Sequence, residues 1–440
     1  MEKGMKGLLS LCLSAIMLAG CSVQTVDQMY QLPKRSEDYS NLQSVLDIAM
    51  ANLSFCAPVA GDNQQSVQMA DIDGDKEQEY LVFAKGSAEL PLRILVFDRV
   101  EDEFIHVDTV ESSGAAFDQV EYVQMDDKPG LEMIVGRQVS DQLVRSVSVY
   151  TFSGGVGEQL LSANYRKYIV VDLDNDGYTE MLVLRPGQTE TDNGVAELYG
   201  ISDGVMERSN EVALSQPADR LKRILVGKLH DKKAAVFVAS SVEDSSLITD
   251  VFAQTDGHLT NVSLSNTSGS SDLTYRNYYV YADDMDNDGV VELPQMRTMI
   301  PLENTGAAGR SDLICWYAMA SDGSTHNKLY TYYDSVGGWY LEIDRDLVPR
   351  ITVQCTANTF DFYLWNDDYT HADALFTVYI LTGQSRENQS REEDRFVLMG
   401  TDTVTYAASL APAAANYGIT PQTLLRSFNL IHRDWNSGEM

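Results

Sequence analysis

Apolar and polar residues alternate in short runs along most of this chain, a pattern that predicts β-strands rather than helices. In one stretch the expected strands cover residues 67–70, 79–84, 92–97 and 104–107, and in a later one 168–171, 180–184, 195–199 and 205–212. β-Branched and aromatic residues are frequent in these runs, and Gly or Asp residues separate them. Four short strands repeated about every 50 residues are typical of β-propeller blades, because a row of independent β-modules would bury too little apolar area per module.

One helix is expected ahead of these strands. Leu42, Val45, Leu46, Ala49 and Leu53 recur at helical spacing and form an apolar stripe. We expect this stripe to pack against the β-domain that follows it.

Three of the repeated units carry the same acidic loop between two strands, with the spacing Asp-x-Asp-x-Asp-x-x-x-Glu. The loops are Asp71, Asp73, Asp75 and Glu79; Asp172, Asp174, Asp176 and Glu180; and Asp284, Asp286, Asp288 and Glu292. A worn copy at 120–135 keeps Asp126, Asp127, Gly130 and Glu132, and a fifth unit at 221–238 keeps the strand pattern without the acidic loop. We therefore expect about five visible four-stranded blades within residues 56–335.

The crowded carboxylates predict a cation site at each loop, because without a cation their mutual repulsion raises their pKa values and costs stability. Calcium takes six to eight oxygen ligands, a number that the carboxylates, a backbone carbonyl and water can supply, whereas the strict octahedron of magnesium suits such a loop poorly. We expect structural calcium ions. The alternative is a set of solvated turns, since Asp and Asn favour turns without any metal.

An EF-hand is the competing calcium motif, and the spacing excludes it. An EF-hand needs a glutamate at loop position twelve, where this chain has Val82, Val183 and Gln295. Position six favours glycine because its φ is positive. Gly177 and Gly289 stand there in two loops, but Lys76 stands there in the first, so we expect strain in the first loop.

These acidic loops resemble the calcium-binding repeats of FG-GAP/VCBS propellers, and the resemblance covers roughly residues 60–330. It implies a β-propeller with calcium in a structural role. By analogy with related loops, the backbone carbonyl ligand would come from position seven, which is Glu77, Tyr178 and Val290.

The net charge of the chain excludes some classes of binding partner. The chain of 440 residues has 65 acidic and 32 basic side chains and a formal net charge of −33. Nucleic-acid binding needs clustered Lys and Arg, and so does adhesion to an anionic membrane through a basic patch. We therefore expect no nucleic-acid partner.

The N-terminus predicts export and a lipid anchor. Lys3 and Lys6 precede an apolar stretch at 8–18 that is too short to span a bilayer. The sequence then reads Leu-Ala-Gly-Cys21, which resembles the lipobox of bacterial lipoproteins. The resemblance implies a signal peptide at 1–20, lipidation of Cys21, a tether and short helix at 21–55, and a protein held on the extracytoplasmic side of the cell membrane. An ordinary secretory signal is the alternative.

The last part of the chain differs in composition from the units before it. All four tryptophans lie after residue 315, and the acidic loop does not recur beyond Glu292. We expect a small α+β domain at 336–440, with strands near 350–355, 360–364, 375–381 and 396–399. We also expect a small-residue helix within 403–417 and a final helix that starts at Thr420-Pro421 and carries an apolar stripe to Trp435.

The sequence contains no phosphate loop, no Gly-x-Ser-x-Gly elbow, no His-Glu-x-x-His motif and no Cys-x-x-Cys pair. We therefore expect a non-catalytic binding or interaction protein, and we expect it to be a monomer. The resemblance to FG-GAP/VCBS propellers implies that the ligand is a glycan, a peptide or another envelope component. The alternatives are a propeller-based polysaccharide lyase or hydrolase, and an envelope sensory or assembly subunit.

Overall fold

The computed structural model describes residues 37–431, except 102, 140–144, 190, 244, 303–311 and 393. The expected signal peptide and the lipidation site at Cys21 lie outside these residues. Within them, no helix is long and apolar enough to cross a membrane.

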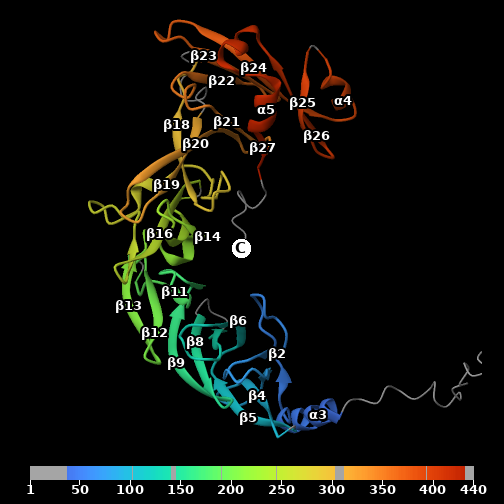
Figure 1. Ribbon diagram of the computed structural model, residues 1–440, viewed down its shortest axis with the longest axis vertical. Coiled ribbons are helices and arrows are strands. Elements are labelled where there is room, and N and C mark those ends of the chain that lie inside the picture. Colours follow the sequence, from blue (N-terminus) through green and yellow to red (C-terminus); the bar gives the residue numbers. More distant parts are fainter. Residues whose placement is uncertain are drawn as a thin grey trace, which may run out of the picture.

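The described chain is mainly β and folds into six antiparallel sheets that follow one another along an open arc (Figure 1). The first sheet contains β1 (Ser54–Phe55), β2 (Val67–Ala70), β3 (Glu79–Lys85), β4 (Leu92–Val100) and β5 (Glu103–Ser112). The second contains β6 (Ala116–Val123), β7 (Glu132–Gln138), β8 (Arg145–Ser153) and β9 (Val156–Tyr165). The third contains β10 (Lys167–Val171), β11 (Glu180–Arg185), β12 (Val195–Ser202) and β13 (Val205–Ala213). The four strands predicted for each of two units are thereby confirmed.

The later sheets continue the row. The fourth contains β14 (Leu221–Lys228), β15 (Ala234–Ser241), β16 (Leu247–Thr255) and β17 (His258–Asn261). The fifth contains β18 (Glu292–Thr298), β19 (Asp312–Met319), β20 (Thr325–Asp334), β21 (Trp339–Glu342) and β27 (Phe428–Leu430). The sixth contains β22 (Ile351–Cys355), β23 (Thr359–Trp365), β24 (Ala372–Thr382), β25 (Phe396–Gly400) and β26 (Val404–Leu410). The helices are α3 (Glu37–Ala49), α4 (Arg386–Gln389) and α5 (Pro421–Ser427), and the 3-10 turns are Ala218–Arg220, Asp272–Thr274 and Pro412–Tyr417.

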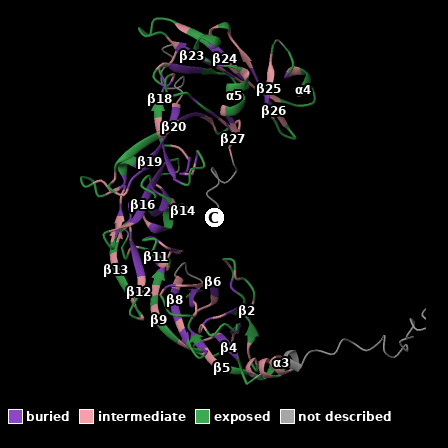
Figure 2. Cartoon of the chain, viewed as in Figure 1, coloured by how far each residue is buried: buried purple, intermediate pink, exposed green. Residues whose placement is uncertain are grey.

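Each sheet shares a hydrophobic core with the next, because successive strand residues point to opposite faces. In β7, Met133 packs toward the first sheet and Ile134 toward the third. In β15, Val236 packs toward the third sheet and Phe237 toward the fifth. Buried residues therefore follow the strands along the row, and exposed residues gather at the turns and on the outer strands (Figure 2).

The helix α3 covers the outer face of the first sheet. Its apolar residues Leu42, Val45 and Leu46 pack on Val82 and Phe97, whose side chains point away from the second sheet. This confirms the predicted packing of the helix on the β-domain. A closed propeller would need the last blade on that same face. The helix occupies it, and among the described residues no strand of the first sheet pairs with one of the fifth or sixth.

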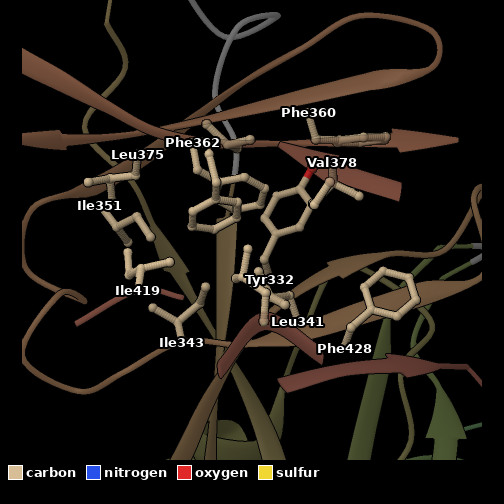
Figure 3. Packing of buried hydrophobic residues seen from close by; sticks show 14 of the residues in the cluster. Tyr332, Leu341, Ile343, Ile351, Phe360, Phe362, Leu375, Val378, Ile419 and Phe428 are labelled. Carbon is tan, nitrogen blue, oxygen red and sulfur yellow. The ribbon is translucent and has the colours of Figure 1, made fainter. Parts of the chain in front are cut away.

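The fifth and sixth sheets share the largest aromatic core. Trp339 of β21 is fully buried and stacks on Phe428, with ring centroids 5.4 Å apart. It also meets Phe360 of β23 edge-on at 5.1 Å, and Figure 3 shows Tyr332, Phe360, Phe362 and Phe428 gathered in this core. Because β21 and β27 join the fifth sheet, the expected boundary at 335/336 falls inside that sheet, and a separate C-terminal α+β domain is not delimited.

Two predictions for this end of the chain were wrong. Residues 403–417 do not form a helix: β26 pairs with β24, and a 3-10 turn starts at Pro412, which lacks the backbone N–H that a helix interior needs. The final helix does begin at Pro421 with Thr420 as its N-cap, as predicted. It ends at Ser427, because Phe428 enters the extended chain of β27 beside Leu341. Trp435 lies outside the described residues.

Candidate metal centre

The three acidic loops occupy the same place in their sheets, immediately before a strand that begins with the glutamate. They precede β3, β11 and β18, which start at Glu79, Glu180 and Glu292. In each loop the carboxylates of the first aspartate, the second aspartate and the glutamate offer oxygens that lie within 4.8 Å of one another: Asp71, Asp73 and Glu79; Asp172, Asp174 and Glu180; Asp284, Asp286 and Glu292. The structure therefore brings together three of the four predicted carboxylates at every loop.

The backbone of the three loops follows one pattern. Position four has a positive φ in all of them, at Gly74, Asn175 and Asn287, and so does position six. Gly177 and Gly289 adopt that conformation freely, whereas Lys76 is held at φ 79°. A side chain in the left-handed region costs roughly 1 kcal/mol or more, so the strain expected in the first loop is present.

The first aspartate of each loop ties the turn together. Asp172 accepts hydrogen bonds from the backbone N–H groups of Asp176 and Gly177 at 3.2 and 3.1 Å, and Asp284 does the same for Asp288 and Gly289 at 3.0 and 2.8 Å. These bonds hold the carboxylates in place before any cation arrives.

The third aspartate stands outside the closest set of oxygens. Asp75, Asp176 and Asp288 each accept a hydrogen bond at 2.8 Å from the backbone N–H of the residue at position seven, which is Glu77, Tyr178 or Val290. The role of the carbonyl groups of these three residues as metal ligands remains a prediction.

In each loop, one carboxylate oxygen of the glutamate accepts a hydrogen bond from a backbone N–H. Glu79 accepts a 2.8 Å hydrogen bond from the N–H of Ile72, and Glu180 and Glu292 accept the equivalent bonds from Leu173 and Met285. The other oxygens of Glu79 and Glu292, Oε1 in both, are buried and have no hydrogen-bond partner, although the ammonium group of Lys328 lies 3.9 Å from Glu292 Oε1. Burial, followed by the neighbouring aspartates, raises the pKa of Glu79 to about 7, and burial also raises the pKa values of Glu180 and Glu292 to about 7.

In the worn loop of the second sheet, side chains of the protein itself contact the matching groups. Glu132 also accepts from a backbone N–H, that of Met125 at 2.9 Å, but its second oxygen receives the hydroxyl of Thr151 at 3.4 Å. Gln124 stands where the other loops have their first aspartate, and its amide donates to the carbonyls of Asp126 and Lys128. Where the first and third aspartates are missing, donors of the protein itself therefore fill the loop, and they include the ammonium group of Lys128, which lies 3.6 Å from Asp126 Oδ2.

The loop at Asp284 has cationic neighbours. The ammonium group of Lys328 lies 2.5 Å from Asp288 Oδ2, 3.5 Å from Asp286 Oδ2 and 3.9 Å from Glu292 Oε1. Lys232 adds a second ammonium 3.8 Å from Asp288 Oδ1. The hydrogen bond from Lys328 lowers the pKa of Asp288. Sequence analysis missed both lysines, because they come from other strands and loops.

The oxygen ligands that the Asp71 and Asp172 loops offer fit a calcium ion. Every side-chain donor is a carboxylate oxygen, as a hard cation requires, and Glu79 Oε1 is a buried acceptor without a donor. A cavity of about 740 Å³ also opens beside Asp174, Asp176 and Glu180.

Comparison with known proteins adds little. No family model and no curated protein matches the chain. Among solved structures it is similar to the exotype rhamnogalacturonan lyase YesX, with 12% identity, 72% of this chain and 76% of that chain covered, and a TM-score of 0.30. It is also similar to Saccharomyces cerevisiae Sqt1 (9% identity, 76% and 81% covered, TM-score 0.29) and to Bacillus licheniformis rhamnogalacturonan lyase PL11 (11%, 69% and 73%, 0.29). Similarities of this size carry no argument about activity.

Proposed function

We propose that this chain is a calcium-stabilised, non-catalytic binding protein of the cell envelope, built as an open row of propeller-like blades. One observation carries the calcium assignment. The buried Oε1 of Glu79 lacks a hydrogen-bond donor in a loop that has all three aspartates, whereas the matching oxygen of Glu132 has Thr151 in a loop where only Asp126 stands at one of those three positions. Glu292 Oε1 also lacks a hydrogen-bond donor, but the ammonium group of Lys328 lies 3.9 Å from it.

Calcium would have a structural role in this protein. At the second loop, Asp172, Asp174, Asp176 and Glu180 would hold the ion, with the Tyr178 carbonyl and water completing a shell of six to eight oxygens. The ion supplies the positive charge that lets the carboxylates stay ionised. At ten times the dissociation constant it stabilises the fold by about 1.4 kcal/mol.

The open arrangement of the sheets supports the proposed binding role. An open row of repeated sheets presents an extended surface, and repeat proteins use such surfaces to bind partners. Loops between blades vary without disturbing the cores, so they suit recognition of a glycan, a peptide or another envelope component.

Location outside the cytoplasm agrees with calcium use, because extracellular modules bind this ion with dissociation constants of about 10⁻⁴–10⁻³ M. We propose that Cys21 carries the lipid anchor, since two acyl chains give stable attachment. Cells that express Cys21→Ala should release the protein or leave it unprocessed, and fractionation with acyl labelling checks this. Acyl labelling of that variant would refute the anchor.

A calorimetric calcium titration of the purified protein tests the proposal. Asp174→Asn should remove or weaken binding at the second loop at least tenfold. Asp126→Asn is the matched control, because Asp126 holds the same loop position in the worn copy, and it should leave the titration unchanged. The absence of saturable calcium binding, or equal effects of the two substitutions, would contradict the proposal.

A further inference from the structure

Lys328 reaches the Asp284 loop from a β-bulge. In the β19–β20 hairpin, Trp316 pairs with Leu329 and Tyr317 with Asn327, so Lys328 is the extra residue. Its side chain is 20% exposed, and its ammonium lies 2.5 Å from Asp288 Oδ2 and 3.5 Å from Asp286 Oδ2. Glu292 Oε1 lies 3.9 Å from this ammonium and has no hydrogen-bond donor, so its contact with Lys328 is electrostatic.

The same bulge recurs in the first three sheets, at the same place in the last hairpin. The extra residue there is Val107 in β5, Leu160 in β9 and Ser209 in β13. Ser209 lines the cavity beside Asp174, Asp176 and Glu180. A bulge re-aims one side chain, and in these sheets that side chain is uncharged.

The ion pairs among the described residues differ between the loops in the same way as the bulge residues do. Carboxylates of the Asp284 loop lie within 4.0 Å of the ammonium groups of Lys328 and Lys232. Among the described residues, the carboxylates of the Asp71 and Asp172 loops form no ion pair of this kind. Two ammonium groups carry the same charge as one calcium ion, and Lys328 donates to Asp288 as a protein-borne cation.

We propose that the Lys328 ammonium takes the place of calcium in the Asp284 loop, so that the protein binds calcium at the Asp71 and Asp172 loops only. This inference rests on the proposed function and refines it, because it makes the residue at the bulge decide whether a loop takes an ion from solution. An ammonium on a flexible stem occupies the loop permanently at high local concentration. Calcium would have to displace it.

The test is a count of saturably bound calcium ions by equilibrium dialysis of the full chain. Ionic strength is kept near 0.15 M, which screens diffuse binding to the acidic surface. Lys328→Met keeps the aliphatic stem and removes the charge. Ser209→Lys places an ammonium at the equivalent bulge of the third sheet. We expect two ions in the unaltered protein, three in Lys328→Met, one in Ser209→Lys and two in the double variant.

The outcomes separate the two claims. Three ions in the unaltered protein, or an unchanged count in Lys328→Met, would overturn the inference and leave the calcium proposal standing. Two ions in Ser209→Lys would overturn the role of the bulge. No saturably bound ion in any of the four proteins would overturn the calcium proposal itself. If Lys328→Met melts early in calcium-free buffer, recovery of its melting temperature on addition of calcium supports the inference, and failure to recover contradicts it.

Discussion

The carboxylate of Glu79 accepts a 2.8 Å hydrogen bond from the backbone N–H of Ile72, seven residues earlier in the chain. The same bond links Glu180 to Leu173, Glu292 to Met285 and Glu132 to Met125. Since it is present in the worn loop too, this bond closes the turn whether or not a cation is bound. The second oxygen of the glutamate is the one left for an ion.

Glu79→Gln separates the role of Glu79 in closing the turn from its role as a ligand of the ion. The amide oxygen can still accept from Ile72, but the buried charge is gone. We expect the variant to melt no lower than the unaltered protein in calcium-free buffer at pH 8, and to gain less stability from calcium by about 1.4 kcal/mol at ten times the dissociation constant. Scanning calorimetry with and without calcium measures both. Glu77→Gln, at an exposed position of the same loop, should respond to calcium as the unaltered protein does, and an equal response of Glu79→Gln would refute the role of Glu79.

The raised pKa values predict how the calcium-free protein responds to pH. Glu79, Glu180 and Glu292 titrate near 7 in the fold against 4.5 ordinarily. Between those values the folded state binds more protons than the unfolded state, so stability falls as pH rises from about 4.5 to about 7. Saturating calcium should reduce this decline, because the ions bind at Glu79 and Glu180 and not at Glu292. Melting temperatures at pH 5 to 8 in metal-free buffer check it, and the triple Glu→Gln variant should show a smaller decline. An equal slope in both proteins would rule out these carboxyls as its source.

Lys76→Gly tests the strain in the first loop. Because Lys76 sits at φ 79°, glycine should relieve the strained backbone and stabilise the calcium-bound protein by up to about 1 kcal/mol. Urea unfolding in saturating calcium measures the change. Lys233→Gly, at an exposed loop lysine without a positive φ, should instead destabilise by roughly 0.4–1 kcal/mol, because glycine gives the unfolded chain more conformational freedom. A loss of stability in Lys76→Gly would show that the strain is not the dominant effect there.

Phe428→Ala probes the core that joins the fifth and sixth sheets. The ring is buried and stacks on Trp339, so its loss should cost about 3–5 kcal/mol. Leu425 of α5 is 44% exposed, and Leu425→Ala should cost within about 0.5 kcal/mol. Denaturant unfolding followed by tryptophan fluorescence compares them. Equal small effects would mean that the C-terminal strand β27 does not hold the two sheets together.

Local patterns predicted the strands and the acidic loops because both depend on neighbours in the sequence. The alternation that marks Glu79–Lys85 is read within a few residues, and β3 forms there. Lys328 and Thr151 could not be assigned to their loops in the same way. Lys328 lies 36 residues after Glu292 (328 − 292) and meets it only because a β-bulge turns its side chain toward the loop.

The closed ring was expected for a similar reason. Repeated blades predict stacking, but whether the row closes depends on what covers the first blade. The amphipathic pattern of α3 predicted packing on the β-domain without indicating which face it would cover. That face is the one a last blade would have needed, with Val82 and Phe97 beneath the helix.

A high-resolution crystal structure of the protein grown in calcium tests the central claim most directly. The account predicts an ion in the Asp71 and Asp172 loops, with six to eight oxygens at about 2.3–2.6 Å. Glu79 Oε1 should be one of these ligands. Density in which both loops hold only water, with Glu79 Oε1 hydrogen-bonded to solvent or to a protein donor, would contradict it.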